Sequence, residues 1–298
     1  MNIEWLKFKL ALAMLLALSL AVLPGCSLLR FGYGQLDLYA AWQADAYFDL
    51  DPEQKQEFRK RFDRLHEWHR HEQLPEYAGF LGATRGRVQK GLTRDDVLWV
   101  TEGVKARYRA IVKHSADDMA ALLMTVTPAQ LETLRREWER DNRRFVGEYR
   151  LDRSVEDQQR AHGRRVLARV RDWVGHLDDV QHRKILEWAR AAPLIHGLRH
   201  QDRLRRQREF IQLMGERGDP QKFAARLRHW LADWEGGRDP EYGRLFDEWL
   251  RQQADLYAEI YRMLLPQQRA AVIARLEGYI DDLTRLARRP ATHAAAGR

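Results

Sequence analysis

The sequence predicts an all-α protein, a multi-helix bundle of long antiparallel helices with no sheet. Alternating runs rich in Val, Ile and Thr, which are typical of strands, are nearly absent from the chain. One helix-start pattern recurs along the sequence, and several of the expected helices carry an apolar residue three positions before a tryptophan. These observations together favour helices that pack through apolar and aromatic side chains.

The recurring pattern places a glutamine three positions after the residue that caps a helix. It is found at Leu50-Asp51-Pro52-Glu53-Gln54, Val126-Thr127-Pro128-Ala129-Gln130, Leu177-Asp178-Asp179-Val180-Gln181 and Leu264-Leu265-Pro266-Gln267-Gln268. A cap oxygen can accept a free backbone N–H, and the glutamine can reach back to the N–H of the cap residue. The third copy lacks the proline and the fourth lacks a capping side chain. Thr93 and Asp96 indicate a weaker start.

The pattern and the positions of glycine and proline together set the expected elements. The predicted helices cover residues 36–48, 52–74, 94–123, 128–149, 154–176, 179–190, 198–214, 220–234, 240–264 and 266–288. The predicted breaks lie near Pro75 and over Gly82–Gly91, Pro193–Gly197, Gly215–Pro220 and Gly236–Pro240.

Five tryptophans follow an apolar residue by three positions, which puts each pair on one face of a helix. The pairs are Leu65/Trp68, Val170/Trp173, Ile185/Trp188, Leu227/Trp230 and Phe246/Trp249. We interpret them as core residues between helices, in preference to a set that stacks on a ligand.

The N-terminus has the pattern of an export signal. Two lysines precede an uncharged run from Leu10 to Leu23, and this run is shorter than the about 20 apolar residues that a membrane-spanning helix needs. Leu23-Pro24-Gly25-Cys26 then resembles the lipobox of bacterial lipoproteins, although Pro24 stands where Ser, Ala, Thr or Val is usual. The alternatives are a plain signal peptide or a signal anchor.

The lipobox resemblance implies cleavage before Cys26, which would carry a diacylglyceryl group on its sulfur and a third acyl chain on its amine. Ser27 follows the cysteine, and by resemblance to enteric sorting rules the absence of Asp there favours the periplasmic face of the outer membrane over the inner membrane. The expected organisation is a signal peptide (1–25), a lipidated cysteine with a short tether (26–35), a helical domain (36–289) and a loose tail (290–298). Two subdomains divided near 177 or 193 are an alternative to one helical domain.

The amino-acid composition limits the classes of molecule that the protein is expected to bind. The formal net charge is +8, and Cys26 is the only cysteine, so no disulfide within the chain is expected. Arginine supplies 42 of the 51 basic residues, and arginine suits paired contacts with carboxylates and phosphates. An export signal disfavours nucleic acid as a partner. Membrane attachment through the lipid is expected, while an envelope protein, anionic lipid head groups and peptidoglycan all stay open.

The most distinctive stretch is Leu50–Gln54, followed by Trp68-His69-Arg70 and by Glu72-Gln73-Leu74-Pro75-Glu76-Tyr77. With the lipobox ahead of it, this stretch resembles a family of uncharacterised proteobacterial lipoproteins. Segments at 126–130, 142–149 and 173–178 fit the same family in order. The resemblance implies a helical lipoprotein that faces the periplasm, and it brings no activity or catalytic residue. A weaker likeness, carried by the helix-start pattern, is to periplasmic helical chaperones and stress sensors with a Leu-Thr-x-x-Gln motif.

The densest titratable cluster runs from His66 to Glu72. On a helix, His66, His69 and Glu72 follow at intervals of three and could present two adjacent metal ligands, with Trp68 beside them. Packing at the edge of the core is the preferred interpretation, because His69 also continues an apolar stripe. His196 and His200 receive less weight.

The sharpest basic run contains Arg203, Arg205, Arg206 and Arg208. A solvated helix face is its ordinary explanation, and a docking patch for an anionic envelope component is the alternative. The sequence assigns no catalytic residue, no metal and no cofactor beyond the lipid on Cys26. We therefore expect a binding, scaffold or chaperone-like lipoprotein. The alternative is a metal-dependent or acid/base hydrolase that uses His66, His69 and Glu72.

Overall fold

The computed structural model describes residues 26–288, and their side chains from Leu29 onward. All regular elements in that range are helices, which confirms the all-α class. The elements are α2 (Cys26–Gly34), α3 (Leu36–Phe48), α4 (Pro52–Trp68), the π-helical turn η1 (His69–Gln73), α5 (Leu74–Lys90), α6 (Arg94–Met124), α7 (Pro128–Tyr149), α8 (Val155–Val174), α9 (Asp179–Ala191), α10 (His196–Gly215), α11 (Pro220–Ala232), α12 (Pro240–Met263) and α13 (Pro266–Ala287). The predicted signal peptide (1–25) and tail (290–298) lie outside the described residues.

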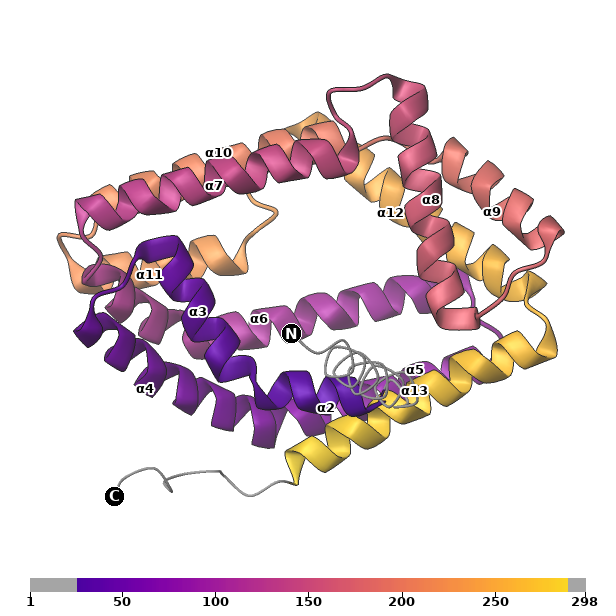
Figure 1. The fold of residues 1–298 in the computed structure, drawn as a ribbon, viewed down its shortest axis with the longest axis horizontal. Helices are drawn as coiled ribbons and strands as arrows, with labels where there is room; N and C mark the ends of the chain where they lie inside the picture. Colours follow the sequence, from indigo (N-terminus) through magenta and orange to yellow (C-terminus); the bar gives the residue numbers. More distant parts are fainter. Residues whose placement is uncertain (1–25, 289–298) are drawn as a thin grey trace, which may run out of the picture.

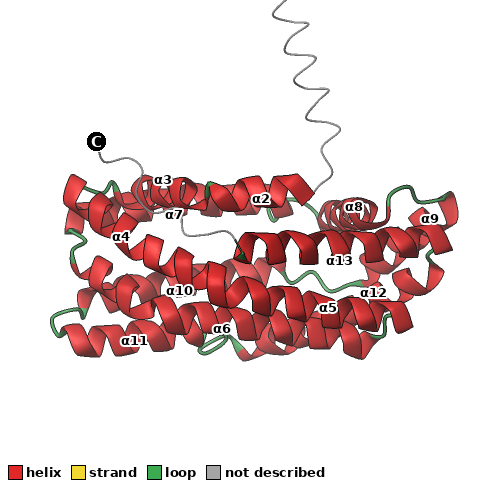
Figure 2. Cartoon of the chain, turned by 90° about the horizontal axis from the view of Figure 1, so that it is seen from below, coloured by secondary structure: helices red, strands yellow, loops and turns green. Residues whose placement is uncertain are grey.

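The helices are arranged in an elongated ring (Figure 1). Helices α7 and α10 form one long side, and α4, α5, α6 and α13 form the other. Helices α8, α9 and α12 lie at one end, while α3 and α11 lie at the opposite end. Seen edge-on, α2 and α3 lie along one broad face of the molecule (Figure 2).

Neighbouring helices run antiparallel, as the order of their contacts shows. The ring of Phe145 lies 5.7 Å from that of His200, and Trp138 lies 5.6 Å from Phe210. Later residues of α7 therefore contact earlier residues of α10, so these two helices run in opposite directions. The contacts between α5 and α13 and between α6 and α11 follow the same reversed order.

Two larger clusters of buried apolar residues lie toward the two ends of the ring. One includes Val88, Val170 and Leu256, and the other includes Leu134 and Phe210. Each cluster combines residues numbered below 177 with residues numbered above 193. The apolar core is therefore not divided at either of the positions where a subdomain boundary was considered.

The glutamines of the recurring pattern join these helix starts in pairs. The side-chain amide of Gln54 donates to Oε1 of Gln130 at 3.1 Å, and the amide of Gln130 donates to Oε1 of Gln54 at 2.6 Å. Gln54 also donates to the carbonyl oxygen of Thr125, and Gln130 donates to that of Asp49. Each glutamine still accepts the N–H of its own cap residue, so both buried amides use their donors and acceptors fully.

The second pair repeats this arrangement at the other end of the ring. Gln181 and Gln268 exchange amide hydrogen bonds of 2.8 and 3.0 Å. Their remaining donors bond to the carbonyl oxygens of Met263 and His176, each two residues before the partner's cap. The first pair thus joins the α3–α4 and α6–α7 turns, and the second joins the α8–α9 and α12–α13 turns (Figure 1).

The predicted breaks at Pro75 and over residues 82–90 are wrong, because α5 is helical from Leu74 to Lys90, and the helix ends only at Gly91. Before Pro75, the π-helical turn η1 widens the helix, and the N–H of Leu74 bonds to the carbonyl of His69. A wider turn accommodates the proline ring without ending the helix. Packing of Leu74 and Ala78 against the end of α13 then outweighs the low helix propensity of the α5 glycines.

The expected short tether over residues 26–35 also differs from the structure, because Cys26–Gly34 forms helix α2. Tyr33 is buried against α5 and α13, and its hydroxyl shares a 3.0 Å hydrogen bond with Nδ1 of His69. Arg30 pairs with the buried Asp282 of α13 at 3.0 Å. These contacts hold the segment on the body, and Gln35 is the only residue between α2 and α3.

Replacing Gln130 by Glu removes two donated hydrogen bonds and places a carboxylate against two acceptors inside the protein. We expect Gln130→Glu to lower the free energy of unfolding by about 3 kcal/mol. Gln201→Glu, at an exposed position of α10, is the matched control and should stay within about 0.5 kcal/mol of the parent chain. Urea denaturation measures both, and equal stabilities of the two variants would contradict the pairing.

Candidate functional site

An apolar cavity of about 300 Å³ lies where α5, α6, α8, α12 and α13 meet. This volume is at the lower end of the range for small-molecule sites. The lining is almost entirely aliphatic or aromatic and consists of Thr84, Val88, Leu92, Val97, Val100, Arg169, Val170, Trp173, Val174, Tyr257, Ile260, Tyr261, Leu264, Val272 and Leu276.

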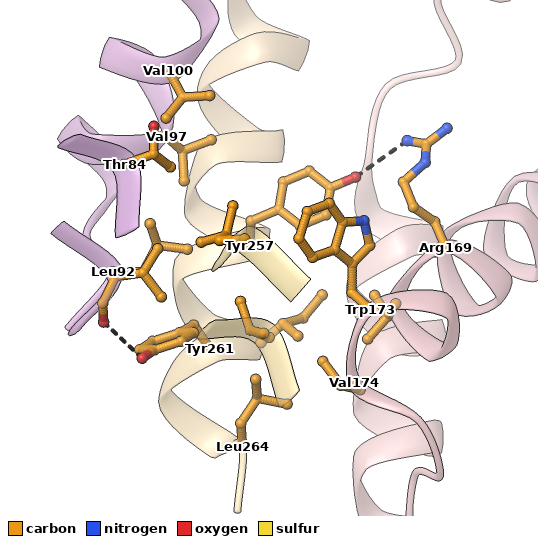
Figure 3. Close-up of a pocket in the computed structure, with 15 residues that line it drawn as sticks. Thr84, Leu92, Val97, Val100, Arg169, Trp173, Val174, Tyr257, Tyr261 and Leu264 are labelled. Atoms are coloured by element: carbon orange, nitrogen blue, oxygen red, sulfur yellow. Dashed lines mark hydrogen bonds between the residues drawn. The ribbon is translucent and has the colours of Figure 1, made fainter. Parts of the chain in front are cut away.

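Helical spacing explains how these residues reach one space. Val170 and Val174 are four apart on α8, as are Tyr257 and Tyr261 on α12 and Val272 and Leu276 on α13. Residues at i and i+4 lie on one face of a helix, so each helix turns an apolar stripe toward the cavity. Figure 3 shows the α8 residues facing those of α12 across it.

Two tyrosines give the lining its fixed polar contacts (Figure 3). The hydroxyl of Tyr261 donates to the backbone carbonyl of Val88 at 2.7 Å. The guanidinium of Arg169 donates to the hydroxyl oxygen of Tyr257 at 3.2 Å, and this bond raises the pKa of Arg169. Both tyrosines are therefore held in place, and Arg169 remains charged.

The charged residues near the cavity lie at its rim. Arg169 is exposed, and Trp173 is 36% exposed. The guanidinium carbon of Arg275 lies 5.5 Å from the centre of the Trp173 ring. Two arginines thus flank an aromatic side chain at the edge of an apolar space, which suits an apolar chain that ends in an anionic group. Sequence reasoning placed Trp173 in the core and missed its position at the cavity rim, because the facing residues come from distant helices.

The structure does not bring His66, His69 and Glu72 together. Glu72 accepts the indole N–H of Trp68 at 2.8 Å, and the ring of Trp68 stacks on His114. His66 and His69 instead lie against Tyr33 of α2, with ring centres 4.7 and 5.8 Å away. Within residues 26–288, no group of three or more His, Cys, Asp or Glu side chains is placed to hold a metal ion.

Burial changes the titration of this aromatic cluster. It lowers the pKa of His69 to about 4 and raises the pKa of Tyr33 to about 12. Both side chains are therefore neutral near neutral pH. Their contacts hold α2 against the π-helical turn, as expected for residues at the edge of a core.

A second group of histidines lies between α7, α8 and α10. The imidazole of His196 packs 4.0 Å from the ring of Tyr149 and 6.1 Å from that of His162. Burial, with the nearby charge of Arg165, lowers the pKa of His162 to about 4 and that of His196 to about 3. His200 stacks on Phe145 instead. Sequence reasoning noted His196 and His200 and missed His162.

The basic run on α10 is largely tied to other side chains. Arg203 donates to Asn142 at 2.7 Å, and Arg205 pairs with Asp202 at 2.7 Å. Arg206 donates to the carbonyl of Trp230, whose ring lies 3.8 Å from its guanidinium carbon. Arg208 is exposed. Three of the four arginines therefore have partners within the protein.

Two of these arginines line a pocket of about 450 Å³ between α7, α10 and α12, which we call the arginine pocket. Four arginines and one aspartate contribute to it, with aromatic side chains between them. Its residues are Phe145, Arg199, Asp202, Arg203, Arg206, Trp234, Arg238, Tyr242, Phe246 and Trp249.

A model of a family of unknown function (DUF6279) matches residues 46–243, about two thirds of the chain. The chain belongs to this family. The DUF6279 match includes the Gln54–Gln130 pair and most of the arginine pocket, and it ends in the first turn of α12. Helix α13 and the rest of α12 lie beyond it and supply one wall of the apolar cavity. No curated protein and no solved structure gave a significant match.

The buried histidines predict acid sensitivity. The pKa values of His162 and His196 in the folded protein are below the unfolded value of about 6.5, so the unfolded chain binds more protons at acid pH. Stability should fall as pH drops below about 6.5, by roughly 1–2 kcal/mol for each histidine near pH 5. His162→Gln should flatten this dependence in thermal melts, while His229→Gln, at an exposed position, should not. Identical slopes in all three proteins would refute this origin.

Proposed function

We propose that the protein is a lipid-anchored helical binding protein on the periplasmic face of the outer membrane. Its ligand is an apolar chain that ends in an anionic group, and the apolar cavity holds that chain. The cavity carries the proposal, because it combines an apolar lining with arginines at the rim. The lipobox resemblance at Leu23–Cys26 supports the anchor and the location.

The lining supplies the affinity and the rim supplies the selectivity. Each CH₂ group removed from water contributes about 0.8 kcal/mol, so a short alkyl segment gains several kcal/mol in the cavity. A guanidinium can form paired, charge-assisted hydrogen bonds with a carboxylate or a phosphate. Arg169 and Arg275 would therefore hold the anionic end at the surface while the chain lies between Val170 and Leu276.

A scaffold or chaperone-like role is the related possibility, in which the anionic partner belongs to an envelope protein or to peptidoglycan. The arginine pocket favours it, since it places Arg199, Arg203, Arg206 and Arg238 around one space with Asp202 as the only lining carboxylate. A nucleic-acid partner is not proposed, because the export signal argues against one.

The hydrolase alternative receives less support from the geometry. Glu72 is engaged by Trp68, whereas His66 and His69 face Tyr33 on the other side of the helix. A shared metal or an acid/base pair would need these groups to converge on one point. Binding is therefore the function that the described residues support best.

Filling the cavity should weaken ligand binding without loss of fold. We expect Val170→Phe and Val272→Phe to weaken binding of cis-parinaric acid, a fluorescent fatty acid, by about tenfold or more, because an added ring occupies the space of the chain. The test protein begins at residue 26 and carries Cys26→Ser, so that its own acyl chains do not compete.

Two controls make the binding test specific. Val104→Phe adds the same ring at an exposed position of α6 and should leave affinity unchanged. Arg169→Met should weaken binding of the fatty acid more than binding of the corresponding fatty alcohol. Unaltered affinity in both cavity variants, with normal circular dichroism, would remove the cavity from the proposal.

The anchor is tested on the full chain in its host membrane. Globomycin or Cys26→Ala should leave an unprocessed precursor, and mass spectrometry of the normal product should find acyl groups on residue 26. Ser27→Asp is the matched control, and it should keep acylation while moving the protein to the inner membrane. Normal maturation in the presence of globomycin would rule out the lipid anchor.

A further inference from the structure

Helices α2 and α3 carry four of the most exposed large apolar side chains on the described surface. Phe31 is 69% exposed, Leu38 63%, Trp42 62% and Tyr39 56%. We call these four residues the aromatic face. Leu38 and Trp42 are one helical turn apart, and the ring of Tyr39 lies 5.9 Å from that of Trp42. Large apolar side chains gathered on one exposed surface indicate an interaction site.

The opposite side of the same two helices is packed on the body. Tyr33 and Leu36 contact the cluster at α5 and α13, while Tyr47 and Phe48 contact the cluster at α6 and α7. Tyr47 also donates to the carboxylate of Asp141. The aromatic face stays exposed although both helices pack on the body, and Figure 2 shows α2 and α3 along one broad side of the molecule.

The position of Cys26 selects the partner of this surface. Helix α2 begins at Cys26, and five residues at 1.5 Å per residue place Phe31 about 7.5 Å further along the axis. The hydrogen bond of Tyr33 and the ion pair of Arg30 with Asp282 prevent α2 from acting as a free tether. A residue held in a bilayer at position 26 would thus keep Phe31 close to the head groups, and α3, which carries the rest of the aromatic face, lies along the same broad side as α2 (Figure 2).

The chemistry of the face fits that location. Tryptophan and tyrosine are enriched where the hydrocarbon core of a membrane meets its head groups, because their rings are apolar with a polar tip. A groove beside the face is lined by Leu38, Trp42, Asp45, Lys55, Phe58 and Arg59, among others, and Lys55 pairs with Asp45 at 2.9 Å. Arg59 is exposed and is the cation there that suits anionic lipid head groups.

We propose that the aromatic face lies in the interfacial layer of the bilayer that holds the lipid of Cys26. Helices α2 and α3 then lie along the membrane surface, and the ring of helices is held directly on the bilayer in one orientation. This inference rests on the proposed lipid anchor. None of the described helices is long and apolar enough to cross a membrane.

Lipid quenching of tryptophan fluorescence tests the orientation. The native lipoprotein is reconstituted in vesicles of phosphatidylethanolamine and phosphatidylglycerol, in which the acyl chains are brominated near the head-group end or near the methyl end. Bromine near the head group should quench more strongly. The loss of this quenching in Trp42→Phe, and its retention in Trp234→Phe, is the expected result.

The outcomes separate this inference from the anchor. Flotation with vesicles and detected acyl groups, together with equal quenching in Trp42→Phe and the parent, would overturn the orientation alone. A protein that neither floats nor carries acyl groups would overturn the proposed function instead. Trp42 emission shielded from both brominated lipid and aqueous acrylamide would show that a second copy covers the face, which also overturns the orientation.

Phe31→Ser combined with Leu38→Ser gives a second measurement. Both positions are exposed, so the fold should survive, and circular dichroism verifies this. We expect the double variant to remain anchored while Trp42 becomes accessible to acrylamide and loses its quenching by lipid. Unchanged quenching in the folded double variant would show that these side chains do not set the orientation.

Discussion

The reciprocal pairing of buried glutamine amides is the constraint on which this fold depends. A primary amide has two donors and an acceptor oxygen with two lone pairs, and each of the four glutamines uses all of them. One oxygen site caps the residue's own helix, and the other accepts from the partner. Glutamate cannot replace either member, because it has no N–H groups to donate. Local helix capping is in this way converted into contacts between residues 76 or 87 positions apart.

The second glutamine pair also positions the cavity. It joins the turn after Val174 to the turn that contains Leu264, and both residues line the apolar space. The ends of α8 and α12 are therefore fixed relative to each other by polar contacts that do not occupy the cavity. Aliphatic side chains alone would tend to close such a space, since protein interiors are close-packed. An apolar cavity next to a rigid polar junction is thus physically reasonable.

Local signals in the sequence were enough to predict most of the helices. They were not enough to predict how the helices pack against one another. The range predicted for α3 coincides with the observed helix. The recurring pattern predicted the capping boxes at Asp51, Thr127 and Asp178, and at Leu265 only the bond from the backbone N–H to the glutamine forms. Helix α5 was missed because proline and glycine are read as breaks, whereas packing against α13 decides its conformation. The amide pairing could not be foreseen, since spacing along the chain does not show which caps meet in space.

The candidate site was harder to foresee for the same reason. Its lining comes from five helices, and each contributes an apolar stripe that looks like ordinary core in isolation. Titratable residues that lie close together in the sequence, by contrast, did not form a common site. Consecutive residues on a helix point in different directions, so Trp68 and His69 meet His114 and Tyr33 respectively. Residues four apart are better evidence of a shared surface, and Val170 with Val174, or Leu38 with Trp42, show this at the cavity and at the aromatic face.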